Sequence, residues 1–248
     1  MFTAREWDVR ALRDIVLDVS ANTGINTVSG FIGGLTDSTP AATFTWQSQQ
    51  SLQFQSAVLS AGNIILEGKT VSASSTSKVA GARLQVKAQG SITLNTALQS
   101  VVAESTGSGN ITILEENDIL LDRIYAQSGA ITVRARGSMT ARSVVGITDG
   151  VGKDITLIAD GMLYVDYVDA GRIAGLYRSA SKVTLRSKRS IVEPADRIDN
   201  VASDGSSMVD VSAFQIRMEY GESTPAARLI KSEGERGTHN ELEVLYTA

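Results

Sequence analysis

Aspartates in the second half of the chain are the residues whose spacing comes nearest to acid–base chemistry. Enzymes that cleave polysaccharides need two carboxyl groups at a set separation, or a base beside a calcium ion held by several oxygens. The tyrosines of the same stretch, Tyr164, Tyr167 and Tyr177, are of the type that stacks on sugar rings. The aspartates considered are Asp154, Asp160, Asp166, Asp169, Asp196 and Asp199.

These side chains do not form the required cluster in the arrangement that the sequence predicts. Asp166 and Asp169 flank inward-facing positions of one repeat, and the neighbouring repeats place Arg142 and Asp122 beside them. The single histidine, His239, lies in a polar segment without a Ser or Cys nucleophile in a defined turn nearby. We therefore interpret the carboxylates as solvated outer residues and predict no catalytic residue.

Metal and phosphate sites are not predicted either. Calcium-binding repeats use a Gly-Gly-x-Gly-x-Asp nonapeptide, which this chain lacks. Turns such as Thr148–Gly150 and Asp204–Ser206 supply too few oxygens for the roughly six to eight ligands of calcium. The segment Gly30–Gly34 is not followed by the Lys-Ser/Thr of a phosphate-binding loop. We expect no metal and no cofactor.

The composition indicates a folded, strand-rich chain. Of 248 residues, 42% are apolar, 22 are Gly and none is Cys, so neither disulfides nor thiol chemistry is available. The net charge is −4, and the nearest basic block, Arg178–Arg189 with Lys182, Arg186 and Lys188, lacks stacking aromatics. No run of about 18 apolar residues is present. We expect neither nucleic-acid binding nor membrane insertion.

The elements that carry these residues are copies of one short pattern, in which an apolar residue, Thr and a second apolar residue follow one another. Alternation of apolar and polar residues continues after each copy, as in a strand with one buried face. Repetition at intervals of 20 to 28 residues is typical of a solenoid. The copies are Ile111–Ile113, Ile131–Val133, Ile155–Leu157 and Val183–Leu185, with looser copies at Ile64–Leu66 and Leu84–Val86.

Stacked copies place equivalent positions above one another, which predicts the core. A small residue at +4 and Gly at +6, as in Ala135 and Gly137, leave room for the chain to bend between strands. Glu115 and Asn117 depart from this pattern. The first apolar position is expected to stack through Ile64, Leu84, Ile111, Ile131, Ile155 and Val183, and the position eight residues later through Ile92, Ile119, Met139, Leu163 and Ile191.

We predict an all-β fold, a right-handed parallel β-helix (β-solenoid) of about eight coils with irregular ends. An antiparallel sandwich is the alternative, but its strands would not resemble one another from repeat to repeat. Residues 1–195 would form the helix, with a long excursion at 20–42. Residues 196–248 would form irregular C-terminal coils and loops.

The segments Gly109–Ile113, Ser128–Val133, Arg136–Ala141 and Asp154–Gly161 resemble filamentous haemagglutinin-type repeats. They are similar above all to the repeats of giant bacterial surface proteins. The resemblance covers about residues 60–193. It implies a β-helical stalk at the bacterial cell surface or secreted from the cell, often part of an adhesin, and a chain that is a fragment of a larger exported protein.

We therefore expect a non-catalytic structural or adhesive module, a stiff stalk or a filament-forming segment. Its expected partners are neighbouring coils or further copies of the same protein, because open strand edges promote end-to-end pairing. One alternative is an adhesin tip whose loops, at 20–42, 196–207 and 231–241, bind a cell-surface glycan or protein. A second alternative is a polysaccharide lyase or hydrolase built on a β-helix.

Overall fold

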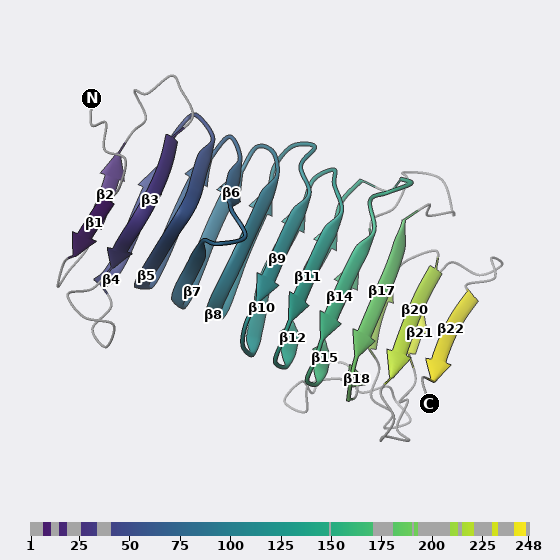
Figure 1. Cartoon of the computed structure of the whole chain (residues 1–248). Helices are drawn as coiled ribbons and strands as arrows, with labels where there is room; N and C mark the ends of the chain where they lie inside the picture. Colours follow the sequence, from purple (N-terminus) through teal and green to yellow (C-terminus); the bar gives the residue numbers. More distant parts are fainter. Residues whose placement is uncertain are drawn as a thin grey trace.

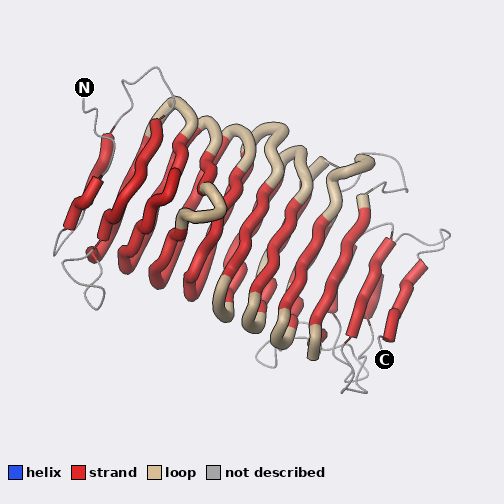
Figure 2. The backbone as a smooth tube through the Cα atoms, in the orientation of Figure 1, coloured by secondary structure: helices blue, strands red, loops and turns tan. Residues whose placement is uncertain are grey.

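The computed structural model describes most of the central part of the chain and short strands on both sides of it. The described residues are 7–10, 15–18, 26–33, 41–148, 150–170, 181–189, 191–192, 209–212, 215–220, 230–232 and 241–246. Figure 2 shows strands joined by loops throughout this part. Within the described ranges, no helix has the length and apolarity needed to cross a membrane.

The strands run in chain order from the N-terminal to the C-terminal end of the molecule. They are β1 (Trp7–Arg10), β2 (Ile15–Asp18), β3 (Asn26–Gly33), β4 (Ala41–Gln47), β5 (Leu52–Gly68), β6 (Val71–Ala73), β7 (Lys78–Ala88), β8 (Ile92–Ser105), β9 (Ile111–Glu115), β10 (Ile119–Ala126) and β11 (Ile131–Ala135). They continue with β12 (Met139–Ala141), β13 (Val144–Gly146), β14 (Ile155–Ala159), β15 (Leu163–Val165), β16 (Tyr167–Asp169), β17 (Lys182–Ser187), β18 (Ile191–Val192), β19 (Val209–Ser212), β20 (Gln215–Tyr220), β21 (Ile230–Ser232) and β22 (Glu241–Tyr246).

Each strand pairs with a strand one turn away, and every pairing among the described strands is parallel. The turns lie side by side along one axis, with the two termini at opposite ends (Figure 1). The fold is a parallel β-solenoid, as predicted, and the sandwich is excluded. About six turns are described on all sides, and they start at Leu52, Val71, Ile92, Ile111, Ile131 and Ile155.

From Ile111 onward each turn has three sides. The first side is formed by β9, β11 and β14, and the second by the Ile119–Leu121 part of β10 with β12 and β15. The third side is formed by the Ile124–Ala126 part of β10 with β13 and β16. We call the bend between the first two sides the first corner, and the bend between the second and third sides the second corner.

Alternation along each strand separates the interior from the surface. In β11, Ile131, Val133 and Ala135 are fully buried, whereas Arg134 between them is exposed. Each large aliphatic side chain that is buried in this way stabilises the fold by about 1.5–3 kcal/mol. The interior rows are Ile111–Ile131–Ile155–Val183 on the first side, Ile119–Met139–Leu163 on the second and Ile124–Val144–Val168 on the third, and the backbone of Ile191 pairs with Leu163.

Two positions of the predicted core rows stack differently. Ile64 pairs with Leu84, but Leu84 pairs with Val101 and not with Ile111. Ile92, which was expected above Ile119, pairs with Ile111 instead. The prediction was wrong because Ile92–Leu94 is itself a copy of the repeated pattern, so a further turn begins between Leu84 and Ile111. The alternation is the same in both arrangements, and all these side chains are buried.

Part of the segment predicted as an excursion, residues 20–42, is a strand of the solenoid. β3 pairs with β1 on one side and with β5 on the other, and its Ile32 is buried. The pairing with β5 shifts register between Val28 and Gly30. The extra residue belongs to β5, in which the buried positions change parity between Phe54 and Ala57.

The described strands near the C-terminus continue the same pairing. β20 pairs with β17 and β22 pairs with β20, which extends the first side. β19 pairs with β16 and β21 pairs with β19, which extends the third side. β21 includes the start of the segment 231–241, which was predicted to be a loop.

Candidate functional site

Two of the aspartates singled out by the sequence, Asp160 and Asp166, lie at corners of the turns, beside cations of neighbouring turns. The Asp160 carboxylate lies 2.9 Å from the Lys188 ammonium and 4.0 Å from the Arg134 guanidinium. Asp166 is buried, and its backbone N–H donates to the carbonyl of Ala141, which places it beside Arg142 of the preceding turn. The tyrosine hydroxyl of Tyr167 donates to Asp169 at 3.1 Å.

These contacts separate the acidic side chains rather than gathering them. Asp154 precedes β14, and its carbonyl accepts the N–H of Ile131. Among the described residues, no group of three or more His, Asp or Glu side chains is placed to hold a metal ion. Asp196, Asp199, Tyr177, Arg178 and His239 lie outside the described residues.

The most irregular place in the described turns is a step between the turn that starts at Ile92 and the turn that starts at Ile111. Thr96 pairs with Glu115 and Ser105 with Ala126, so the second turn needs two more residues to cover the same path. One of the extra residues is Asp122, where the pairing of β10 with β8 shifts register. The turn that starts at Ile111 is therefore longer than its neighbour between the first corner and the second corner.

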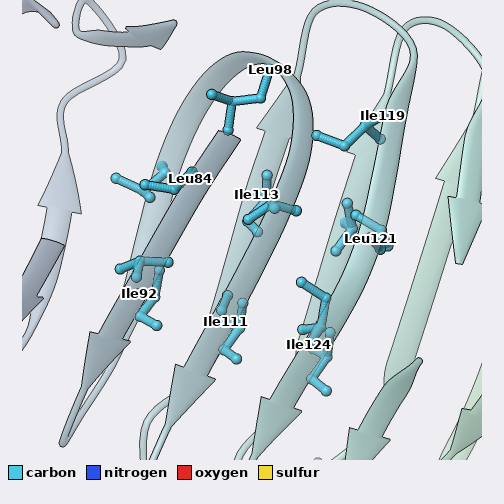
Figure 3. Close-up of a cluster of buried hydrophobic side chains, with 14 of the residues drawn as sticks. Leu84, Ile92, Leu98, Ile111, Ile113, Ile119, Leu121 and Ile124 are labelled. Carbon is cyan, nitrogen blue, oxygen red and sulfur yellow. The ribbon is translucent and has the colours of Figure 1, made fainter. Parts of the chain in front are cut away.

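Glu115 lies inside the solenoid at this step. Its side chain is buried beside the interior residues shown in Figure 3, among them Leu98, Ile113 and Ile119. The carboxylate accepts the Thr96 hydroxyl at 2.7 Å and the Leu98 N–H at 3.0 Å. It also accepts the N–H of Asn117 at 2.9 Å. Glu115 thus satisfies backbone donors that the diverging strands leave without a carbonyl partner.

Different surroundings shift the pKa values of two adjacent glutamates in opposite directions. Desolvation raises the pKa of Glu115 above its usual value of 4.5, although the hydrogen bond from Thr96 and the backbone donors act against it. The hydrogen bond from Lys78 lowers the pKa of Glu116, and the charges of Lys78 and Arg136 add to this effect. The step therefore holds a carboxyl with a raised pKa beside one with a lowered pKa.

A polar cleft of about 570 Å³ opens on the outside of the step. Its floor is formed by Ala97, Leu98 and Gln99 of β8 and by Gly81 of β7, and its wall by the turn Glu116–Asp118 with Arg136 and Gly137. Two ion pairs cross the narrow turn on either side of Gly81. Lys78 pairs with Glu116, and the Arg83 guanidinium lies 3.6 Å from the Asp122 carboxylate.

The first corner is closed to side chains at Gly137. A Cβ atom at this position would lie 2.5 Å from the Asp118 backbone nitrogen, where real Cβ contacts do not occur. The Asp118 carboxylate accepts the N–H of Ser138 at 2.6 Å and holds the two turns at this distance. The sequence pattern placed Gly here for bending, whereas the structure shows that close approach of the neighbouring turn also requires it.

The cleft can bind a polar ligand through amide, carboxylate and guanidinium groups, but the described residues provide no nucleophile–base pair there. Comparison with known proteins gives no match: no family model, no curated protein and no solved structure is similar to this chain. Sequence reasoning did not find the cleft. The departure of Glu115 and Asn117 from the small-residue and Gly positions was the signal that pointed to it.

Proposed function

We propose that the chain is a non-catalytic structural segment, a stiff β-solenoid stalk or filament-forming part of a larger secreted or cell-surface bacterial protein. One observation carries the proposal. Parallel pairing and a hydrophobic core run through all of the described turns from Leu52 to Ala170, so that bending would break pairing and packing at the same time. The resemblance of the repeats to those of filamentous haemagglutinin-type and giant surface proteins supports this role.

The arrangement of charges also supports a structural role over catalysis. Polysaccharide lyases and hydrolases on solenoids need carboxylates from adjacent turns within reach of one sugar. Here Asp122 and Asp166 are separated by Arg142, and Asp160 lies beside Lys188 and Arg134. Release of reducing sugars from a panel of polysaccharides would contradict the proposal.

The test of the stalk role is the shape and stiffness of the isolated chain. Small-angle scattering is expected to give a rod, and sedimentation velocity is expected to show association that grows with concentration, as open strand edges pair. In single-molecule force measurements, the force that unfolds the chain along the solenoid axis should be higher than the force that detaches one turn perpendicular to the axis. A compact monomer at high concentration would overturn the proposal.

The step cleft favours a second candidate, binding of a glycan or protein by an adhesin. It is a concave polar surface with Arg136 and Gln99 available for hydrogen bonds, on an otherwise regular rod. Glycan-array binding that is lost in an Arg136→Ala, Gln99→Ala double variant would support this role. An Arg123→Ala variant, changed on the third side, is the matched control. Equal binding by the two variants would remove the cleft from consideration.

A further inference from the structure

Charged residues occupy equivalent places at both corners of successive turns. At the first corner, the N–H of Arg136 donates to the carbonyl of Glu115, that of Asp160 to Ala135 and that of Lys188 to Ala159, at 3.0, 2.9 and 3.1 Å. At the second corner, the N–H of Arg142 donates to Leu121 and that of Asp166 to Ala141. The first-corner row is Glu116, Arg136, Asp160 and Lys188, and the second-corner row is Asp122, Arg142 and Asp166.

Both rows change sign at every turn, and they change sign together. The turn that starts at Ile111 is acidic at both corners, through Glu116 and Asp122. The next turn is basic at both, through Arg136 and Arg142, and the turn after it is acidic again. Arg142 donates to Asp122 at 2.7 Å, and Lys188 contacts Asp160 at 2.9 Å, so these rows contain direct contacts between opposite charges.

The rows extend backward over the narrow turn. The turn that starts at Ile92 carries uncharged residues at both places, Ala97 at the first corner and Val101 with Val102 opposite Asp122 at the second. The turn before it carries Lys78 and Arg83, which reach across to Glu116 and Asp122. The order of signs along the axis is therefore basic, neutral, acidic, basic, acidic and, at the first corner, basic.

The interior does not fix this order. Ile111, Ile131 and Ile155 are followed by Thr and another apolar residue in every case, so each turn presents nearly the same apolar surface to its neighbours. If the turn at Ile131 were skipped, the strand at Ile155 would pack on the strand at Ile111 equally well. The corners would then bring Asp160 over Glu116 and Asp166 over Asp122, at the strand spacing of about 4.8 Å.

We propose that the alternating corner charges are a pairing code, by which each turn accepts only a neighbour of opposite sign and a skipped register is rejected. The code supplies the order of turns that the repetitive interior lacks. Like charges directly opposite one another across paired strands destabilise the pairing, and opposite charges stabilise it. The inference goes beyond the structural role and does not depend on it.

The first test reverses the sign of one turn with Arg136→Glu and Arg142→Glu together, which produces three acidic turns in succession. The melting temperature is expected to fall by roughly 5–10 °C, because contacts at both corners become repulsive on both faces of the turn. Addition of 1 M salt should restore part of the loss by screening. The control is Lys69→Glu with Lys153→Glu, which changes the net charge equally and lies away from both rows.

The second test reads the register itself. The described chain contains no cysteine, so introduced cysteines give an unambiguous cross-link. Thr112, Thr132 and Thr156 form one outward row, in which neighbours are about 4.8 Å apart and next-nearest residues about twice that. A Thr112→Cys, Thr132→Cys pair reports the native register, because a disulfide spans about 4.4–6.8 Å between Cα atoms. A Thr112→Cys, Thr156→Cys pair reports the skipped register.

In the chain with native corner charges, the Thr112→Cys, Thr156→Cys pair is expected to give no cross-link above background. In the sign-reversed variant, the yield of this cross-link should be at least several-fold above that background. Native cross-linking alone, with a melting temperature equal to that of the control variant, would overturn the code. If the reversed variant does not fold, Arg136→Gln with Arg142→Gln replaces it. This neutral variant should keep the native cross-link, and a skipped cross-link in it would show that repulsion is not what rejects the wrong register.

Discussion

The turns before the step, which we call the first region, and the turns after it, which we call the second region, both enclose a hydrophobic interior. Their cross-sections differ. Before the step, β5, β7 and β8 follow the bends as long continuous strands of 17, 11 and 14 residues. After it, the turns that start at Ile131 and Ile155 are divided into shorter strands, with Gly137 and Gly161 at their first corners. Three of the ion pairs among the described residues lie wholly within the turns after the step, namely Arg134–Asp160, Arg142–Asp122 and Lys188–Asp160.

The two regions also differ in the size of their interior side chains. Trp46 and Phe54 pack edge to face before the step, with ring centroids 5.2 Å apart. After it, the buried hydrophobic side chains in residues 111–170 are aliphatic or Met. The buried rings of the described residues lie in β4 and β5, and from β7 onward the buried hydrophobic side chains are aliphatic or Met. The comparison therefore places the largest interior side chains in the turns furthest before the step.

The largest effect is expected from removing an aromatic ring in the first region. Phe54→Ala should lower the free energy of unfolding by about 3–5 kcal/mol, because it loses buried area and leaves a cavity beside Trp46. Urea denaturation followed by tryptophan fluorescence measures this loss. Ile155→Val in the second region is the comparison, with an expected cost of about 0.5–1.5 kcal/mol. A smaller cost for Phe54→Ala than for Ile155→Val would contradict the difference in packing.

The next effect tests the closed corner of the second region. Gly137→Ala is expected to cost about 1–3 kcal/mol, because the new methyl group must displace the Asp118 backbone. The matched control is Gly146→Ala in the same turn, where a Cβ would meet its nearest atom at an ordinary 3.6 Å. Thermal unfolding compares the two variants. Equal melting temperatures would show that the corner is not closed.

A comparable effect is expected at the step itself, where the regions meet. Glu115→Ala should cost about 1–3 kcal/mol, because the Leu98 and Asn117 N–H groups lose their acceptor inside the protein. Glu115→Gln keeps one carbonyl acceptor and should cost less. Amide hydrogen exchange at Leu98 is the local readout, and it should accelerate in the Ala variant. Unchanged exchange would mean that Glu115 does not cap this N–H.

The smallest expected effect is the pH dependence of the free energy of unfolding. Because burial raises the pKa of Glu115, the pH-dependent part of its contribution to stability is fully present below the unfolded value of 4.5 and is lost as the pH rises through the folded value. Glu116 behaves oppositely: its lowered pKa gives stability above the unfolded value that is lost as the pH falls. Carboxyl NMR titration should show Glu115 titrating at higher pH than Glu116, and the reverse order would contradict the assigned environments.

The sequence predicted which side chains face the interior, but it predicted only in part which strand stacks on which. Alternation is a local property of a strand, so Ile131, Val133 and Ala135 were assigned to the interior from three residues alone. The rows through Ile111 and Ile119 followed from the constant spacing of eight residues between these two positions in each turn from Ile111 onward. The same spacing misplaced Leu84 and Ile92, because the turn between them and Ile111 has a different cross-section.

The amino-acid sequence by itself determined that the chain is a repetitive, strand-built solenoid, since period-two alternation and recurring Ile-Thr segments need no distant contact to be recognised. Only the tertiary structure decided where the cross-section changes, why Glu115 is buried, and which charges meet at the corners. These features depend on the relative path of two neighbouring turns. A difference of two residues between those paths is small in the sequence, yet it opens the cleft and exposes the backbone donors that Glu115 accepts.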